Sequence, residues 1–334
     1  MKEIVYKSKM LSYFACVLTR LHHPGFQKEI KKRSELDLFD YKNIAKSLPK
    51  YYEEICTDNN CFGIGRCIRK YSGYKGSYVK GWIEHGYFYF DTVSSLASIS
   101  FAKSILTFGS HREKVNVQYL PKKKCVKIGP YIHYADDYID EETFKELKAK
   151  LGRVLLVFPM HSGTGQKVQY DIDELFKNVE SVAGDFDTVL FSLFWTDINS
   201  EYVSQIESRG FKTVCSGHRF DPYFLSRQKT IIKLADVTLS NGLGTNLVYC
   251  TYLKKPHWLI RQKRTYASLN AIGDKHKTFQ ENNINKASVV ELLYDIFKDY
   301  RNDLSEVQYD LCSQLFGFND IKSPIEMLDL LSSL

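Results

Sequence analysis

The sequence predicts an α/β protein with a parallel, doubly wound sheet in its second half. After Gly152, strand-like and helix-like segments alternate about every twelve residues, which is typical of parallel strands joined by crossover helices. The segments 153–160 (RVLLVFPM) and 186–195 (FDTVLFSLFW) are continuous apolar runs, as expected for strands buried on both faces. A length of 334 residues is sufficient for a second domain in front of this sheet.

The first half has a less regular pattern. The first ~60 residues are mixed and partly helical, and 78–91 (YVKGWIEHGYFYFD) predicts a strand, a turn and a strand. Residues 98–115 predict a helix, the short strand SILTFG and a polar loop, and 125–140 begins as a strand and ends as an acidic loop. Residues 140–152 (DEETFKELKAKLG) predict a helix, because acidic residues open it, basic residues close it and a glycine follows.

The second half predicts its elements in a regular order. The expected strands are 153–160, 186–195, 211–217, 236–240 and 256–261, with helices at 171–184, 199–210, 223–235 and 246–255 and a loop at 161–169. The tail from 287 to 334 reads as helices. In such a sheet, ligands bind at the carboxyl ends of the strands. The loops of interest are therefore 160–166, 194–199, 217–221 and 240–245.

The charge is unevenly distributed along the chain. The net charge is +7, yet residues 1–130 hold 23 Lys and Arg against 11 Asp and Glu, while residues 131–334 hold 23 against 28. A basic first half suggests an anionic partner, such as a membrane surface, a diphosphate lipid or a nucleic acid. The alternative is a set of solvated lysines without a partner.

Cysteine usage and hydropathy indicate a cytoplasmic protein. The eight cysteines show no CxxC spacing, so we expect free thiols in a reducing compartment. Arg20 interrupts the apolar stretch near the start, which argues against a signal peptide, and no run of 18 apolar residues exists. Peripheral attachment to the cytoplasmic face of the inner membrane stays open.

The loop SNGLGT follows a predicted strand and opens a predicted helix. Gly242 and Gly244 let the backbone approach a ligand closely, and the helix N-terminus favours an anion. Ser240, Asn241 and Thr245 add side-chain donors. The loop lacks the spacing of a nicotinamide fingerprint and the Gly-Lys of a Walker loop. We therefore expect a phosphate-binding loop, with a tight turn capped by Thr245 as the alternative.

Two further loops lie at the same predicted edge. Ser162, Gly163 and Thr164 follow the first strand of this half, and simple turn chemistry is their alternative reading. His218 and Arg219 follow the third strand. Arg binds phosphate bidentately and His can donate to a leaving diphosphate. Otherwise His218 would bond a neighbouring backbone group and Arg219 would pair with the aspartate two residues on.

A carboxylate and an imidazole stand together in the first half. Glu84 and His85 precede Gly86 at the end of a predicted strand, where they suit proton abstraction from a hydroxyl. The alternative is a turn with a solvated glutamate. The sequence contains no HExxH motif, no serine elbow of the G-x-S-x-G type and no separated aspartate pair in a suitable loop. No metal and no cofactor are expected.

Three segments carry a family resemblance. The segment LADVTLSNGLGTNLVYCTYLKKPHWLI (234–260) resembles the donor domain of two-Rossmann, GT-B type glycosyltransferases, and KGWIEHGYFYFD (80–91) resembles their acceptor-side "HG" strand end. With GHRFDPYFLSRQKTIIKLAD (217–236), the chain looks like bacterial capsule and O-antigen biosynthesis proteins. The resemblance covers most of 80–262 and is architectural. Asn246 and Tyr249 stand where an acidic residue often grips the ribose, which leaves UDP-linked and CMP-linked sugars open.

The resemblance implies a specific architecture. It implies an α/β fold of two Rossmann-like domains that face a central cleft, followed by C-terminal helices. The implied parts are an acceptor-side domain at 1–148, a nucleotide-sugar-binding domain at 149–290 and a helical tail at 291–334 that packs back on both.

The resemblance also implies a metal-independent glycosyltransferase of surface polysaccharide synthesis. The donor is a nucleotide sugar and the acceptor a saccharide or lipid-linked saccharide. The backbone of 242–245, with Ser240 and Arg219, would stabilise the leaving phosphate. Glu84 or His85 would deprotonate the acceptor if the reaction inverts. The alternatives are a sugar-nucleotide epimerase of similar build and a non-catalytic nucleotide- or polysaccharide-binding assembly protein. A nucleic-acid partner is not expected.

Overall fold

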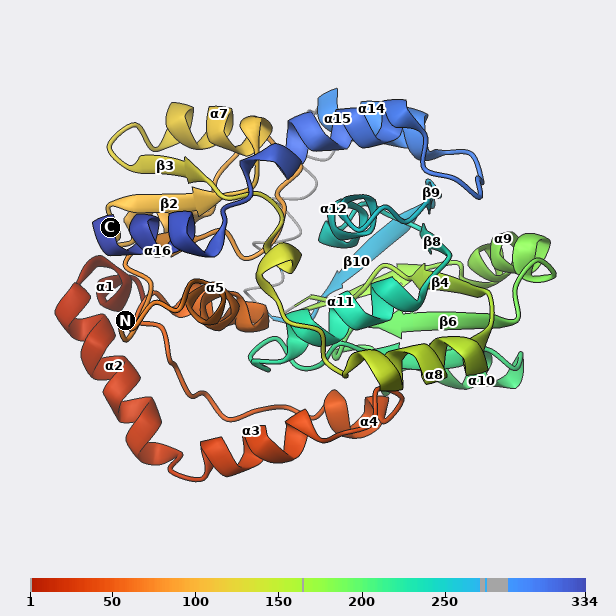
Figure 1. The fold of residues 1–334 in the computed structure, drawn as a ribbon, viewed down its shortest axis with the longest axis horizontal. Coiled ribbons are helices and arrows are strands. Elements are labelled where there is room, and N and C mark those ends of the chain that lie inside the picture. The colour runs from red at the N-terminus through yellow and green to blue at the C-terminus, as the bar shows by residue number, and fades with distance from the viewer. Residues whose placement is uncertain (1, 164, 271–273, 275–287) are drawn as a thin grey trace.

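A five-stranded parallel sheet forms the centre of the second half in the computed structural model, which describes residues 2–163, 165–270, 274 and 288–334 (Figure 1). Its strands are β4 (Val154–Phe158), β6 (Thr188–Leu193), β7 (Lys212–Cys215), β8 (Val237–Ser240) and β9 (His257–Leu259). Their order is β7-β6-β4-β8-β9. The first strand of the series is thus central, and the chain winds outward from it twice. The strand order reverses between β4 and β8, and such folds bind ligands beyond the carboxyl ends of the strands at this switch point.

Helices cover both faces of this sheet. They are α8 (Glu141–Leu151), α9 (Ile172–Ala183), α10 (Glu201–Ser208), α11 (Phe224–Leu234) and α12 (Thr245–Tyr252). Alternate residues of β4 point to opposite faces, as the period of a strand requires. Leu155 packs in the cluster that includes residues of α9 and α10, whereas Leu156 packs in the cluster with α11 and α12. The predicted α/β class with parallel sheets and C-terminal helices is confirmed.

Helix boundaries follow local capping chemistry. The Asp140 carboxylate accepts a hydrogen bond from Thr143 N at the start of α8, and Gly152 ends that helix with a positive φ of 63°. Asp171 likewise accepts from the backbone N–H groups of Asp173 and Glu174 at the start of α9. These bonds satisfy N–H groups that have no partner inside the helix.

The first half contains a smaller parallel sheet. Its strands are β1 (Trp82–Ile83), β2 (Ser104–Thr107) and β3 (Lys124–Lys127), in the order β1-β2-β3. Helical segments surround them: α5 (Ile64–Ser72), α6 (Ser95–Ile99), α7 (Ser110–Tyr119), and the 3₁₀ turns η1 (Thr57–Gly63) and η2 (Tyr131–Tyr134).

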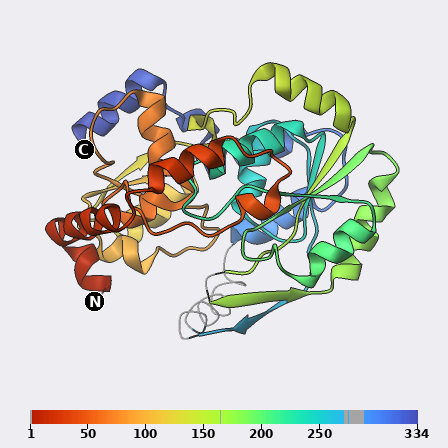
Figure 2. The same cartoon turned by 90° about the horizontal axis from the view of Figure 1, so that it is seen from below.

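Three sequence-based element predictions were wrong. The predicted hairpin at 78–91 forms only β1 and a long loop, because Arg112 holds the loop's carbonyl groups at Phe90 and Thr92 in place of a second strand. The predicted polar loop after β2 is the helix α7. The predicted loop at 161–169 contains β5 (Gln166–Tyr170), which pairs antiparallel with β10 (Arg264–Ser268). This ribbon, the lime and blue arrows at the bottom of Figure 2, stands apart from the main sheet.

The N-terminal and C-terminal helices lie along both halves of the molecule. The N-terminal helices are α1 (Lys2–Lys7), α2 (Lys9–His22), α3 (Phe26–Ser34) and α4 (Tyr41–Ile44), and the C-terminal segments are α14 (Ser288–Phe297), α15 (Glu306–Phe316), η3 (Phe318–Asp320) and α16 (Pro324–Ser333). The α4 helix contacts β7 and α14 contacts β9, whereas α15 contacts α7 and α16 contacts α5. The predicted domain boundaries at 148/149 and 290/291 stay a prediction. None of the helices described is long and apolar enough to cross a bilayer.

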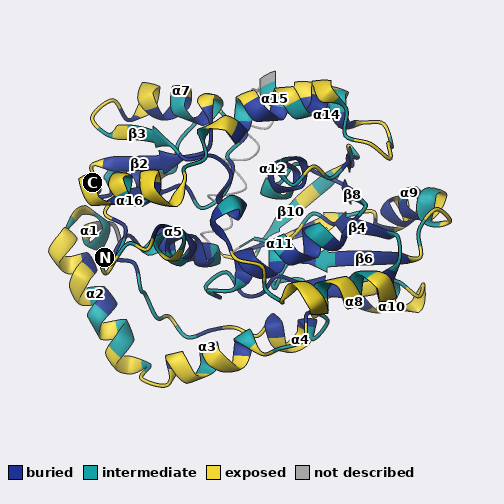
Figure 3. Cartoon of the chain, viewed as in Figure 1, coloured by how far each residue is buried: buried dark blue, intermediate teal, exposed yellow. Residues whose placement is uncertain are grey.

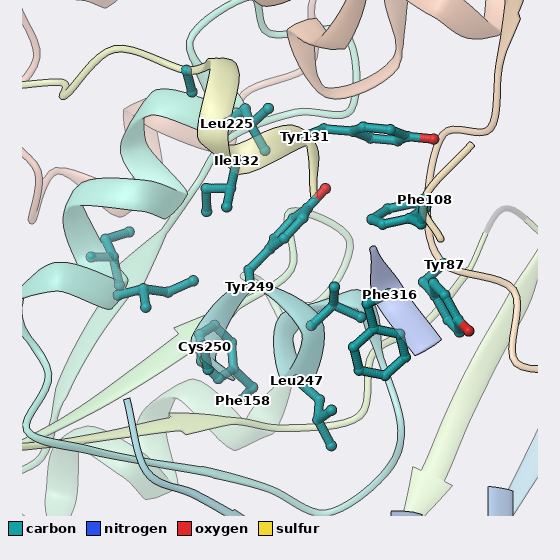
Figure 4. Packing of buried hydrophobic residues seen from close by; sticks show 14 of the residues in the cluster. Tyr87, Phe108, Tyr131, Ile132, Phe158, Leu225, Leu247, Tyr249, Cys250 and Phe316 are labelled. Carbon is teal, nitrogen blue, oxygen red and sulfur yellow. The ribbon is translucent and has the colours of Figure 1, made fainter. Parts of the chain in front are cut away.

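One hydrophobic cluster joins the two sheets. Figure 4 shows Phe108 and Tyr131 of the first half close to Leu225 and Tyr249 of the second. Phe316 of the C-terminal tail packs in the same cluster. The halves therefore share a buried core as well as peptide connections, and Figure 3 shows this burial at the junction.

Candidate functional site

Ser240 and Asn241 lie beneath the predicted phosphate loop rather than at its surface. The Ser240 side-chain oxygen lies 2.9 Å from Nε2 of His257, in the sheet. Asn241 is fully buried: its Oδ1 accepts from Met160 N at 2.6 Å and its Nδ2 donates to Gln262 Oε1 at 2.6 Å. These bonds tie the ends of β4 and β8 together at the switch point. Both side chains direct their polar groups to the protein itself, so they are not available as donor contacts.

The two glycines of this loop stand where side chains would collide. A Cβ on Gly242 would lie 2.7 Å from Cγ of Met160 and 2.9 Å from Nη1 of Arg264. A Cβ on Gly244 would lie 2.4 Å from Oδ1 of Asn246. Gly244 is also the N-cap of α12, with extended backbone angles. Side chains at either position would therefore collide with neighbouring atoms, and the turn into α12 needs glycine here.

The N-terminus of α12 has the features of an anion site. The first N–H groups of a helix have no intrahelical partner and carry a partial positive charge. Nδ2 of Asn246 is buried and has no hydrogen-bond partner among the described residues. Thr245, at the first helical position, keeps its hydroxyl proton for donation while its oxygen accepts a backbone bond. An anionic group at this position could accept hydrogen bonds from the backbone N–H groups, from the Asn246 amide and from the Thr245 hydroxyl.

The loop after β1 lies directly on this helix N-terminus. Tyr87 N donates to Oγ1 of Thr245 at 2.9 Å, and the Tyr89 hydroxyl donates to the Gly244 carbonyl oxygen at 2.8 Å. A Cβ on Gly86 would lie only 3.2 Å from Oγ1 of Thr245. The structure therefore brings together the two segments, around His85 and around Gly244, that the sequence proposed for acceptor and donor.

His85 pairs with an aspartate that the sequence did not indicate. Nδ1 of His85 lies 3.4 Å from Oδ2 of Asp58, which η1 supplies. The imidazole is 31% exposed and the carboxylate 10%, so the ring is the accessible part of the pair. A carboxylate at Nδ1 orients an imidazole and stabilises its protonated form. Because the sequence separates these residues widely, only the fold reveals the pair.

Glu84 is engaged in a buried ion pair. Its Oε1 accepts from Nη2 of Arg112 at 2.7 Å, and its Oε2 accepts from the Thr107 hydroxyl. Glu84 is 6% exposed and Arg112 is fully buried. Since these contacts occupy both carboxylate oxygens, we leave Glu84 out of the proposed catalytic group.

Phe62 marks the junction of the halves with a strained backbone. Its φ is 59°, a left-handed conformation that is uncommon for a bulky residue. Its N–H donates to the Arg219 carbonyl oxygen at 2.6 Å, and its ring lies 4.7 Å from that of Phe224 and 6.3 Å from that of Phe194. These contacts hold η1, and with it Asp58, against the loop that carries Arg219.

His218 is a neutral residue in this structure. Burial, together with the positive charges of Arg33 and Arg219, lowers the pKa of His218 to about 4. Its Nδ1 accepts from Phe220 N at 3.3 Å, so the ring proton is on Nε2. His218 can therefore donate one hydrogen bond without carrying charge. Its ring packs against Trp195, with centroids 4.4 Å apart.

Arg219 contacts the other half of the molecule. Its Nη2 donates to Sγ of Cys61 at 3.4 Å. The alternative pairing with Asp221 is not observed, because that carboxylate bonds Arg33 at 3.2 Å and Arg227 at 2.9 Å. Arg219 thus lies beside η1 at the junction.

The second glycine loop has its polar groups engaged. Ser162 N donates to Oδ2 of Asp197 at 2.9 Å, and the Ser162 hydroxyl oxygen accepts from Val168 N at 3.2 Å. Gly163 N donates to the Gln166 carbonyl oxygen at 3.1 Å. Thr164 lies outside the described residues. Donor binding by this loop stays a prediction.

Several residues at the site were not predicted from the sequence. They are Asp58, Phe62, Tyr87, Tyr89 and Trp195. Trp195 lies in a loop that the sheet topology had indicated. The other four come from η1 and from the stretch taken for a hairpin. No group of three or more His, Cys, Asp or Glu in the described part of the chain is placed to hold a metal ion, and metal independence stays a prediction.

Comparisons with known proteins give only distant likeness. No protein-family model and no curated protein matches the chain. The wall teichoic acid polymerase TagF is similar at 13% identity and a TM-score of 0.35, covering 69% of this chain and 57% of that one. The UDP-GlcNAc 2-epimerase of Neisseria meningitidis, bound to UDP-GlcNAc, is similar at 11% identity and 0.35, with 71% and 61% covered. UGT2 of Phytolacca americana, complexed with UDP-2fluoro-glucose and pterostilbene, is similar at 9% identity and 0.31, with 70% and 53% covered.

The extent of this likeness is limited. The chain spans less than two thirds of the length of each of these three structures.

Proposed function

We propose that the chain is a glycosyltransferase of surface polysaccharide synthesis, such as capsule, O-antigen or lipopolysaccharide. It moves a sugar from a UDP- or CMP-linked donor to a saccharide or lipid-linked acceptor, with peripheral contact to the cytoplasmic face of the inner membrane. One observation carries the proposal: the loop that holds His85, paired with Asp58, bonds the first residue of α12 through Tyr87 N, at the switch point of the sheet. A proton acceptor and an anion site on adjoining segments are the two parts that group transfer from a phosphate needs.

In this proposal the donor phosphate binds at the start of α12. The backbone N–H groups of 242–245 and the amide of Asn246 donate to it, and Arg219 adds positive charge. His218 contributes a neutral donor at Nε2. These groups stabilise the negative charge that grows on the leaving phosphate.

His85 is the proposed base on the acceptor side. As the acceptor oxygen attacks the anomeric carbon, Nε2 of His85 takes the hydroxyl proton. The bond between the anomeric carbon and the phosphate oxygen breaks, and its electron pair leaves with the phosphate. Asp58 at Nδ1 stabilises the imidazolium that forms. This sequence describes an inverting reaction.

The test combines donor binding with turnover. Purified protein is mixed with UDP-, GDP-, TDP- and CMP-sugars, and thermal stability and slow donor hydrolysis are followed. A ligand at about 100 times its Kd adds about 2.7 kcal/mol of stability, so one nucleotide class should raise the melting temperature. His85→Ala should lower hydrolysis by about 10²-fold or more and keep the thermal shift. His23→Ala, at the end of α2, is the matched control and should change neither.

Other outcomes assign other functions. A raised melting temperature together with an epimerised nucleotide sugar as product would favour the epimerase. A raised melting temperature without turnover would favour a binding protein. If His85→Ala keeps full hydrolysis, the proposed base is wrong. If no nucleotide shifts the protein, the phosphate site and the transferase proposal both fail.

A further inference from the structure

The helix α2 exposes its large apolar side chains, whereas a helix that packs on a protein core normally buries them. Ser12 and Cys16 are buried against the protein, while the large apolar side chains point outward. Of the thirteen large apolar side chains exposed among the described residues, seven lie in this region: Ile4, Met10, Leu11, Tyr13, Phe14, Leu18 and Leu21. Figure 3 shows α2 at the outer boundary of the molecule with exposed residues along it. Water-facing apolar residues at this density indicate an interaction surface.

Specific polar contacts fix the rotation of α2. Arg20 donates from Nε to the Tyr52 carbonyl oxygen and from Nη2 to that of Glu53, both at 2.8 Å. Sγ of Cys16 lies 3.4 Å from the Glu54 carbonyl oxygen. Turning the helix to bury its apolar side would break these bonds. The outward position of the apolar side chains is therefore a stable feature of the fold.

The exposed residues form one continuous stripe. Met10, Phe14, Leu18 and Leu21 follow one another at spacings of four, four and three residues, which places them on one side of a helix. We call this surface the α2 stripe. Its length matches that of the fourteen-residue helix.

Positive charge flanks the α2 stripe. Residues 1–34 contain eight Lys and Arg and only two Glu. Lys7 and Lys9 are exposed at its start, and Lys28, Lys31 and Lys32 are exposed on the adjoining helix α3. Aromatic and aliphatic residues on one side with lysines at the margins are the signature of a helix lying in a membrane interface. Each lysine near an anionic bilayer adds attraction that salt weakens.

We propose that the α2 stripe inserts into the interface of an anionic lipid bilayer, with α2 parallel to the membrane plane. The charge favours a bilayer over a second copy of the chain, because two copies meeting through this surface would bring two basic regions together. This inference rests on the membrane contact proposed above and is independent of the transfer chemistry. Since α2 holds the backbone of 52–54, docking would also place the segment leading to Asp58 near the membrane surface.

Vesicle flotation of the full chain without donor tests the proposal. We expect binding to phosphatidylcholine vesicles with about 30% phosphatidylglycerol, and binding at least about tenfold weaker without the anionic lipid or at high salt. Phe14→Ser with Leu18→Ser should abolish binding. The matched control is Val307→Ser with Ile325→Ser, which are at least as exposed but lie on α15 and α16, and it should bind as the unaltered chain does.

A charge series isolates the lysines. Lys28→Glu, Lys31→Glu and Lys32→Glu together should weaken binding at least about tenfold, whereas Lys145→Glu with Lys150→Glu on α8 should not. The proposal is overturned if the unaltered chain does not bind anionic vesicles, or if both control pairs lose binding equally. It is also overturned if Phe14→Ser with Leu18→Ser converts a dimer to a monomer and vesicles never bind. Failure of donor binding in the transferase assay would leave these results unaffected.

Discussion

His257 is a fully buried histidine held between two hydroxyl groups. Its Nδ1 lies 2.8 Å from Oγ1 of Thr238 and its Nε2 lies 2.9 Å from Oγ of Ser240. Because the Thr238 hydroxyl donates its proton to the Pro256 carbonyl oxygen, it accepts from Nδ1, and Ser240 donates to Nε2. The neutral ring thus satisfies both nitrogens. Burial lowers the pKa of His257 to about 3.

We expect this histidine to make folding sensitive to mild acid. The folded pKa is about 3 and the unfolded one is near 6.5, so the unfolded chain binds the proton more readily. The free energy of unfolding is therefore independent of this titration above pH 6.5, and it decreases by about 1.4 kcal/mol per pH unit as the pH falls toward 3. Urea unfolding between pH 7.5 and 5 measures this slope. His257→Gln should reduce this slope and leave the part that comes from His218, whose pKa burial also lowers, whereas His23→Gln, at a partly exposed position, should not change it; an unchanged slope in His257→Gln would contradict the assignment.

Asn116 is a buried amide without a partner. Neither Oδ1 nor Nδ2 has a hydrogen bond in the described structure, and the residue is 1% exposed. Replacing it by a similar apolar side chain removes a desolvation cost, so Asn116→Leu should raise the free energy of unfolding by about 1–2 kcal/mol. Asn59→Leu is the contrasting variant, because Asn59 bonds Gly81 and Ile83, and it should lower stability. Destabilisation by Asn116→Leu in urea titrations would reveal a role for that amide.

Residue identity alone indicated half of the proposed catalytic pair. His85 stood out beside a glycine at a strand end, whereas Asp58 lies in a turn with no distinguishing neighbours. Ser240 and Asn241 had the right chemistry for a phosphate, but the fold directs them into the sheet. A side chain's type is visible in the sequence; the direction in which it points depends on contacts with distant segments.

The loop between β1 and α6 has no regular secondary structure, and the side chain of Arg112 holds it in place. Arg112 bonds Glu84 through two nitrogens and the carbonyl groups of Phe90 and Thr92 at 2.9 and 3.1 Å. This arrangement holds both ends of the segment that contains His85. The sequence predicted a strand, a turn and a strand here, and the four consecutive aromatic residues at 87–90 favour a strand.

Removing this arginine should be strongly destabilising. Arg112→Leu leaves the Glu84 carboxylate buried without its partner, which costs about 3–5 kcal/mol. Glu84→Leu combined with Arg112→Leu should recover part of that loss, because no charge then remains buried. Urea unfolding of the four proteins forms a double-mutant cycle. Simple additivity of the two single changes would show that the pair is not coupled.

Elements of the main sheet were predictable because each carries its own signal. Buried strands are apolar runs and the helices between them have caps, so periodicity within about a dozen residues identifies them. The pairing of β5 with β10 was not predictable, since it joins segments nearly a hundred residues apart and neither has a marked apolar pattern. The same holds for α7, whose polar composition resembles a loop.

The whole molecule is organised around a core common to both sheets. Ile83 and Phe108 belong to the same cluster as Leu156 and Leu247, and α3, α8 and α15 carry the chain between the halves. A large apolar interface of this kind couples domains that otherwise move and unfold separately. The overall layering followed from the sequence, but this coupling depends on which helix faces meet.

We therefore expect one cooperative unfolding transition. Scanning calorimetry should give a single endotherm whose van't Hoff enthalpy equals the calorimetric one. Leu247→Ala, in the common core, should lower its midpoint without splitting it, because both halves lose the same support. Two resolved endotherms in the unaltered chain would show that the halves fold independently.

The position of α4 against β7 has a consequence for self-association. β7 is an edge strand of the main sheet, and an uncovered edge offers unpaired N–H and C=O groups to other chains. Tyr41 and Ile44 of α4 pack in the cluster that contains Cys215 of β7. A chain that lacks residues 1–50 would keep every strand of the sheet but lose the packing of α4 against β7. We therefore expect the chain without its first fifty residues to self-associate more readily than the full chain.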